Sequence, residues 1–78
     1  MTSEIVSPLP GTFYRAPGPD QPPFKREGDW VAIGDTIGVV EVMKSFHPVE
    51  SEVEGRLARF LIENEDPVMP GEAVAELE

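Results

Sequence analysis

Lys44 is the residue of this chain best suited to a covalent reaction. It lies between two runs rich in β-branched and aromatic residues, 37–42 and 46–49. Such runs favour two strands that meet in a tight hairpin, which leaves the lysine amine in water at or beside the turn. A lysine amine is nucleophilic only when deprotonated, so covalent modification of Lys44 would need an enzyme that supplies a favourable site and an activated donor. The alternative is an ordinary solvated turn lysine.

Met43 indicates that the turn does more than reverse the chain. Turn positions favour Asn, Asp or Gly, whereas Met43 is large and apolar. An apolar side chain held out beside a lysine predicts a docking surface that another protein reads, with packing on the hairpin as the alternative. Glu41 could contribute to the same recognition. Its alternative is a solvent-facing strand carboxylate, which is favoured because Glu78 takes the matching place in the repeat described next.

The strands that position Lys44 belong to an internal repeat. Segment 27–41 aligns with 64–78 at a separation of 37 positions, and Gly34 then meets Gly71. Each copy predicts a strand start, a glycine turn and an apolar strand. Segment 7–13 aligns with 51–57 at a separation of 44. The two separations differ by seven, which places an insertion in the first copy, within the proline-rich segment 15–23.

Two copies of one β unit predict an all-β fold, a flattened barrel or sandwich with quasi-twofold symmetry. Nine prolines and seven glycines support short strands joined by turns. Segment 55–62 has apolar residues at helical spacing but is short, and Gly55 matches Gly11, so we expect a strand there. Lys44 lies between the copies. We therefore expect the lysine at one pole and both chain ends near the opposite pole.

Composition limits the functions open to the chain. With 78 residues we expect one domain over 1–78, and the absence of cysteine excludes disulfides and thiolate metal sites. A net charge of −9 argues against binding to nucleic acid or anionic lipid. The acidity either maintains solubility or steers the protein to basic patches on partners. No apolar run reaches 18 residues and residues 1–4 show no secretory signal, so we expect a cytoplasmic protein.

Catalysis by the chain itself is not expected. It has one histidine, His47, and no cluster of metal-ligating residues. Paired carboxylates need a cleft to raise a pKa, and a chain of this size would struggle to enclose one.

The motif around Lys44 resembles a known family. Glu41-Val42-Met43-Lys44 is similar to the Glu-Ala-Met-Lys signature of biotin carboxyl carrier domains, in which the lysine carries biotin in amide linkage. Val42 stands where alanine is usual, and Ser45 where methionine commonly follows the lysine. Lipoyl domains, the sister family, usually carry Asp-Lys-Ala, so Met43 favours biotin. A lipoyl carrier remains an alternative because of Ser45, and an unmodified protein-interaction module is a third.

The resemblance covers residues 5–78. It implies two four-stranded antiparallel sheets with quasi-twofold symmetry, a barrel-sandwich hybrid. Segment 7–20, with Ser7-Pro8 and residues 11–15, resembles the start of the bacterial acetyl-CoA carboxylase carrier, in which a short insertion called the thumb projects beside the biotin. The prolines of 17–23 fall at that place and could touch biotin, or form a stiff surface loop.

The resemblance also implies a role and partners. Biotin would be covalently attached to Lys44, and Met43 and Glu41 would assist recognition by a biotin protein ligase. The other partners implied are biotin carboxylase and a carboxyltransferase, in the acetyl-CoA carboxylase of fatty acid biosynthesis. The chain would be a non-catalytic carrier. Bacterial carriers usually have a long N-terminal region with a linker, whereas here the resemblance begins near Met1, as expected for a freestanding carrier or a fragment.

Overall fold

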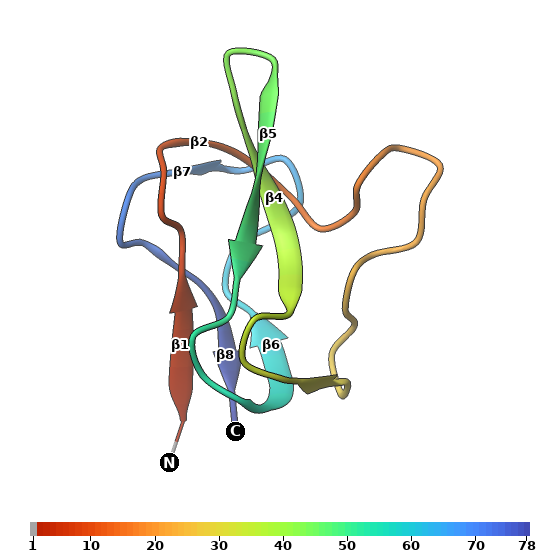
Figure 1. Cartoon of the computed structure of the whole chain (residues 1–78), viewed down its shortest axis with the longest axis vertical. Helices are drawn as coiled ribbons and strands as arrows, with labels where there is room; N and C mark the ends of the chain where they lie inside the picture. The colour runs from red at the N-terminus through yellow and green to blue at the C-terminus, as the bar shows by residue number, and fades with distance from the viewer. Residues whose placement is uncertain (1) are drawn as a thin grey trace.

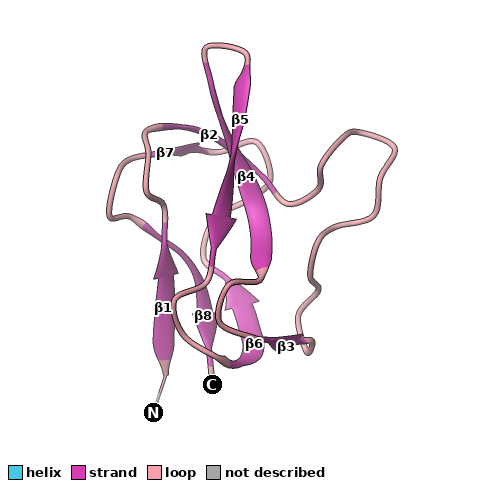
Figure 2. Cartoon of the chain, in the orientation of Figure 1, coloured by secondary structure: helices cyan, strands magenta, loops and turns pink. Residues whose placement is uncertain are grey.

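The fold consists of strands and loops. The computed structural model describes residues 2–78, and no helix occurs among them (Figure 2). The strands are β1 (Ser3–Val6), β2 (Gly11–Tyr14), β3 (Trp30–Val31), β4 (Thr36–Val42), β5 (Ser45–Glu50), β6 (Gly55–Phe60), β7 (Pro67–Val68) and β8 (Ala73–Leu77). The all-β prediction is confirmed, and the segment with helical spacing forms strand β6.

The strands form two four-stranded antiparallel sheets, with the orders β1-β8-β6-β3 and β5-β4-β2-β7. The two orders match strand by strand when each strand is exchanged for the one four places away in the chain: β1 corresponds to β5, β8 to β4, β6 to β2 and β3 to β7. The predicted quasi-twofold relation between the copies is therefore confirmed. Strand β1 was not predicted; it corresponds to β5, but it pairs with β8 from the far end of the chain.

One apolar core lies between the two sheets and receives side chains from every strand. Its members have exposed fractions of 3% or less: Ile5, Phe13, Val31, Ile37, Val40, Val49, Leu57, Val68, Val74, Ala75 and Leu77. Strand β6 shows the alternation that a sheet with one solvated face requires, whereas four successive residues of the central strand β4 are buried. Burial of these side chains is the main favourable term in folding.

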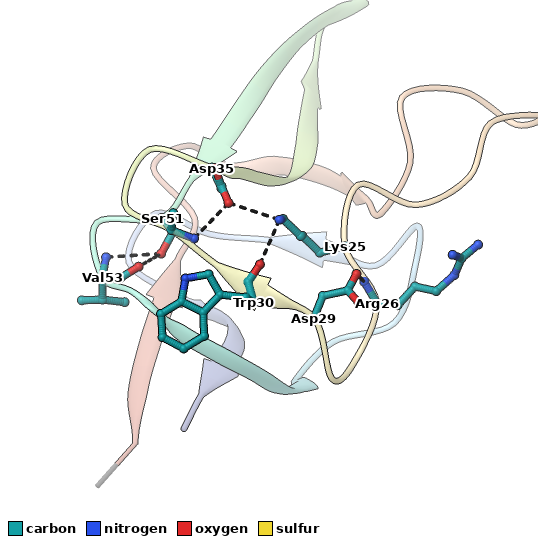
Figure 3. A network of polar contacts seen from close by, with 8 residues as sticks. Lys25, Arg26, Asp29, Trp30, Asp35, Ser51 and Val53 are labelled. Atoms are coloured by element: carbon teal, nitrogen blue, oxygen red, sulfur yellow. Dashed lines mark hydrogen bonds and ion pairs between the residues drawn. The ribbon is translucent and has the colours of Figure 1, made fainter.

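Two buried serines join the copies at equivalent places. The Ser7 amide donates to the Glu72 carbonyl at 2.9 Å, and the Ser51 amide donates to the Asp35 carbonyl at 2.9 Å. Each serine hydroxyl donates to the carbonyl two residues later, as Figure 3 shows for Ser51 and Val53. These bonds satisfy polar groups that would otherwise be costly to bury.

The insertion predicted in the first copy is the long loop between β2 and β3, drawn in orange to yellow in Figure 1. Arg15 fixes its base: the Arg15 amide donates to Asn64 Oδ1 at 2.8 Å, and the Phe24 amide donates to the Arg15 carbonyl at 3.0 Å. The Arg15 guanidinium lies 4.3 Å from the centre of the Phe60 ring. The residues on either side of the loop 16–23 are therefore bonded to each other, and Arg15 is bonded to the β6–β7 loop as well, so the segment is an anchored loop and not a free linker.

The β4–β5 hairpin projects from one end of the molecule, and the C-terminal residue and the start of β1 lie at the opposite end (Figure 1). This arrangement confirms the predicted separation of Lys44 from the chain ends. Among residues 2–78 no helix is long and apolar enough to cross a membrane.

Candidate functional site

Lys44 lies at the tip of a hairpin with a two-residue loop. Val42 and Ser45 form the last pair of the β4–β5 ladder, so Met43 and Lys44 alone make the connection. Both have positive φ, 49° and 69°. Positive φ at both central residues defines a type I′ turn, whose right-handed twist matches that of the strands. The hairpin prediction is confirmed, and the turn uses side chains that this conformation disfavours.

The tip presents its side chains to solvent. Met43 is 94% exposed, and Lys44 is exposed as well. Of the two salt bridges found within residues 2–78, neither involves Lys44; they join Lys25 to Asp35 and Arg59 to Glu76. The amine can therefore reach a partner without first giving up an ion pair. The packing alternative for Met43 is excluded by its exposure, while its role in recognition stays a prediction.

Glu41 is a strand carboxylate that has a partner within the fold. It is half-buried on the outer face of β4, and the Tyr14 hydroxyl donates to its Oε1 at 3.2 Å. The hydrogen bond to Glu41, with its negative charge nearby, raises the pKa of Tyr14 above the usual value. A phenol is already protonated at neutral pH at its ordinary pKa of about 10, so the Tyr14 hydroxyl can donate to Glu41 there. Spacing along the sequence does not reveal this contact, because the two residues are 27 positions apart and meet only where β2 pairs with β4.

Aromatic side chains cover the hairpin face next to Glu41. Phe46 is the cross-strand partner of Glu41, is 58% exposed, and its ring centre lies 6.3 Å from that of Tyr14. Between this face and the insertion runs an open groove of about 550 Å³. Its lining comes from β2, β5, the insertion and the β6–β7 loop: Tyr14, Arg15, Ala16, Pro17, Gly18, Pro19, Gln21, Pro23, Phe46, Asn64 and Glu65.

Sequence reasoning missed Tyr14 and Phe46, although the repeat contains a signal for both. At the same separation of 44 positions, Tyr14 meets Ala58 and Phe46 is met by Thr2. At each of these two pairs of equivalent positions, only the member near the Lys44 hairpin is aromatic. A change from a non-aromatic residue in one copy to an aromatic residue in the other is the signal that would have drawn attention to both positions.

His47 lies half-buried on β5 opposite Val40. Within residues 2–78 no group of three or more His, Asp or Glu side chains is placed to hold a metal ion.

Comparison with known proteins gives consistent matches over most of the chain. A carrier from Chlamydia muridarum, named biotin carboxyl carrier protein of acetyl-CoA carboxylase, is 46% identical over 67 residues, which are 86% of this chain and 41% of that protein. The protein of the same name from Nostoc sp. is 39% identical over 66 residues, 85% of this chain and 36% of its own length. Carrier protein 2 of Arabidopsis thaliana, chloroplastic, is 44% identical over 64 residues, 82% of this chain and 25% of its own. The chain thus spans less than half the length of these relatives.

A family model also matches the chain. The family is described as biotin-requiring enzyme, and its model matches residues 3–77, from the first strand to the last. By this match and by its identity to the relatives above, the chain belongs to the biotin/lipoyl attachment family of biotin-requiring enzymes.

Proposed function

We propose that residues 1–78 form one attachment domain that carries biotin in amide linkage on Lys44. The observation that carries this proposal is the Met43–Lys44 turn. Two non-glycine residues hold left-handed conformations at a projecting tip, and Met43 is 94% exposed. Conformations of this kind cost of order 1–3 kcal/mol each and persist where the surrounding structure imposes them, often at functional sites.

The reaction at Lys44 is acyl transfer. The deprotonated Nζ attacks the carboxyl carbon of an activated acyl donor, an amide bond forms, the bond to the leaving group breaks, and the amine loses a proton. A biotin protein ligase would supply biotinyl-adenylate and a base. Within this chain, Met43 would be read by the ligase and Glu41 would assist. The domain supplies no catalytic group of its own and acts as a carrier.

The proposed role of the loaded domain is transport of a carboxyl group. A biotin carboxylase would load it and a carboxyltransferase would receive it, as in the acetyl-CoA carboxylase of fatty acid biosynthesis; we place the carrier with these partners in the cytoplasm. The names of the relatives support this proposal. Tethering replaces free diffusion by a high effective concentration at both enzymes, and the hairpin projects clear of the chain ends (Figure 1).

Intact mass after co-expression with a biotin ligase tests the proposal, with peptide mapping around Lys44. We expect one biotinyl adduct, located on Lys44, and none in Lys44→Arg. Lys25→Arg is the matched control, because that lysine is engaged by Asp35 and the Trp30 carbonyl (Figure 3); it should be modified as the unaltered protein is. A lipoyl or octanoyl adduct would assign the chain to the sister family. No adduct would favour an interaction module.

A further inference from the structure

The contact between Tyr14 and Glu41 joins two strands beneath the Lys44 turn. Thr12 and Val39 are the direct cross-strand partners of Glu41 and Tyr14, so Tyr14 reaches Glu41 along a diagonal of the outer face. Diagonal neighbours in a sheet are within reach of aromatic side chains. The Tyr14 hydroxyl donates to Glu41 Oε1 at 3.2 Å, and the cross-strand partner of Glu41 is Phe46. Glu41 therefore has an aromatic neighbour on each adjacent strand, and Tyr14 is the one that bonds to it.

The second copy of the repeat is an internal control for this contact. Glu78 corresponds to Glu41, whereas Ala58 corresponds to Tyr14. Strand β6 forms with alanine at that position and pairs with β8 on one side and β3 on the other. The β unit therefore folds without a tyrosine. The hydroxyl is present in the copy that leads to Lys44, which favours a role at the hairpin rather than in folding.

The chemistry of the donor supports the same conclusion. A lysine or arginine beside Glu41 would orient the carboxylate but also neutralise it. A neutral phenol restricts the carboxylate and leaves its full negative charge for a partner. Orienting a side chain before binding reduces the conformational entropy lost when the complex forms. The feature fits a cationic or N–H-bearing surface on the enzyme that modifies Lys44.

We propose that Tyr14 is a positioning residue for the modification of Lys44: its hydroxyl fixes the Glu41 carboxylate in the orientation that the acylating enzyme binds. This inference rests on the proposed function. It assigns to Tyr14 no contact with the reacting atoms. Because Tyr14 acts only through Glu41, replacing Tyr14 should have no effect once Glu41 is removed, and a double-mutant cycle tests this directly.

The experiment measures the initial rate of biotin incorporation against carrier concentration, with purified unmodified protein, a biotin ligase, ATP and biotin. Tyr14→Phe removes the hydroxyl and retains the ring beside Phe46. We expect kcat/KM to fall about fivefold to tenfold, mainly through a higher KM, as for loss of one typical hydrogen bond. Glu41→Ala should lower kcat/KM at least as much. In the Glu41→Ala background, Tyr14→Phe should cause no further change.

Controls separate this inference from stability and from the proposed function. Glu78→Ala removes the equivalent carboxylate of the second copy and should leave kcat/KM unchanged. Thermal unfolding of each variant shows whether it is folded at the assay temperature. If the unaltered protein is not biotinylated, the proposed function fails. Two results would overturn the positioning role while leaving the proposed function standing. In one, the unaltered protein is biotinylated and Tyr14→Phe reacts at the same rate; in the other, Tyr14→Phe lowers the rate by the same factor whether or not Glu41 is present.

Discussion

Gly38 lies directly against the ring of Phe13. A Cβ atom at Gly38 would be 2.5 Å from Phe13 Cε1 and 2.8 Å from the Tyr14 carbonyl oxygen. Phe13 is fully buried, so its ring has no room to move aside. In the second copy the equivalent positions hold Ala75 and Leu57, both in the core. The two copies thus fill equivalent space in different ways. The first copy sets glycine against a large phenylalanine, and the second sets alanine against a smaller leucine.

This relationship predicts a compensating pair of substitutions. Gly38→Ala should lower the free energy of unfolding by about 2–3 kcal/mol, because overpacking forces the ring or the backbone to shift. Phe13→Leu alone should lower it by about 1–2 kcal/mol, because it leaves a cavity. The double variant reproduces the pair of the second copy and should lose less stability than the two single losses added together; the loss that remains comes from the Tyr14 carbonyl oxygen, which lies 2.8 Å from the new Cβ. Urea unfolding measures all three.

Gly18→Ala is the matched control for Gly38→Ala, since a Cβ there meets only Gln21 Cγ at an ordinary 3.6 Å. Its free energy of unfolding should change by no more than about 0.5 kcal/mol. Additive losses in the Phe13→Leu/Gly38→Ala variant would show that the two residues do not share the same space.

Met43→Asn should stabilise the fold while impairing modification. Asn tolerates the left-handed conformation that Met43 adopts at φ 49°. We expect the free energy of unfolding to rise by about 0.5–1 kcal/mol. The rate of biotin incorporation at Lys44 should fall, because the exposed apolar side chain is lost.

Met69→Asn is the matched control for Met43→Asn. Met69 is also exposed, at 64%, but it is not among the residues with positive φ. This variant should gain no stability and should be modified at the original rate. Unfolding can be followed by the fluorescence of Trp30, the one tryptophan in the chain. An unchanged rate in Met43→Asn would remove Met43 from the recognition surface.

Tyr14 should titrate above pH 10. The hydrogen bond to Glu41 and the nearby carboxylate raise its pKa. Because Tyr14 is the single tyrosine, the ultraviolet absorbance of tyrosinate reports on it alone. The raised pKa contributes stability below pH 10 that is lost as the pH rises through the folded value. Glu41→Gln should move the titration back toward 10, whereas Glu78→Gln should not; a midpoint unaffected by Glu41→Gln would contradict the contact.

Asp35 should make stability depend on acid pH. The Ala32 amide donates to its carboxylate at 2.9 Å, and Lys25 Nζ lies 3.1 Å from the same oxygen. These contacts hold the pKa of Asp35 below its usual value. The resulting stability is present above about pH 3.9 and is lost as the pH falls through the folded pKa.

Asp35→Asn should therefore flatten the dependence of unfolding free energy on pH between about pH 5 and pH 2. Asparagine retains an oxygen that can accept from the Ala32 amide. Lys25→Met should flatten the same limb to a smaller degree, because the hydrogen bond from the Ala32 amide, the largest single cause of the pKa shift, remains. Urea unfolding at each pH checks both, and an acid limb unchanged in Asp35→Asn would contradict the assignment.

The sequence by itself determined the features that depend on local pattern. Strands β4 and β5, the turn at Met43–Lys44, the copies related through Gly34 and Gly71, and the place of the insertion all followed from residue types and spacing. Neighbouring strands joined by a tight turn must pair, so a local pattern suffices to define the hairpin. Repetition then placed the hairpin between two similar units.

Only the tertiary structure decided the contacts between distant segments. The pairing of β1 with β8 joins Ser3 to Leu77, and the bond that positions Glu41 comes from Tyr14, 27 residues away. A short strand with few apolar residues gives little periodic signal, and a carboxylate on a strand carries no mark of its partner. The left-handed conformation of Met43 was decided in the same way. The twist of the paired strands imposes a type I′ turn on residues that would not choose it, because the ladder on both sides outweighs the local cost.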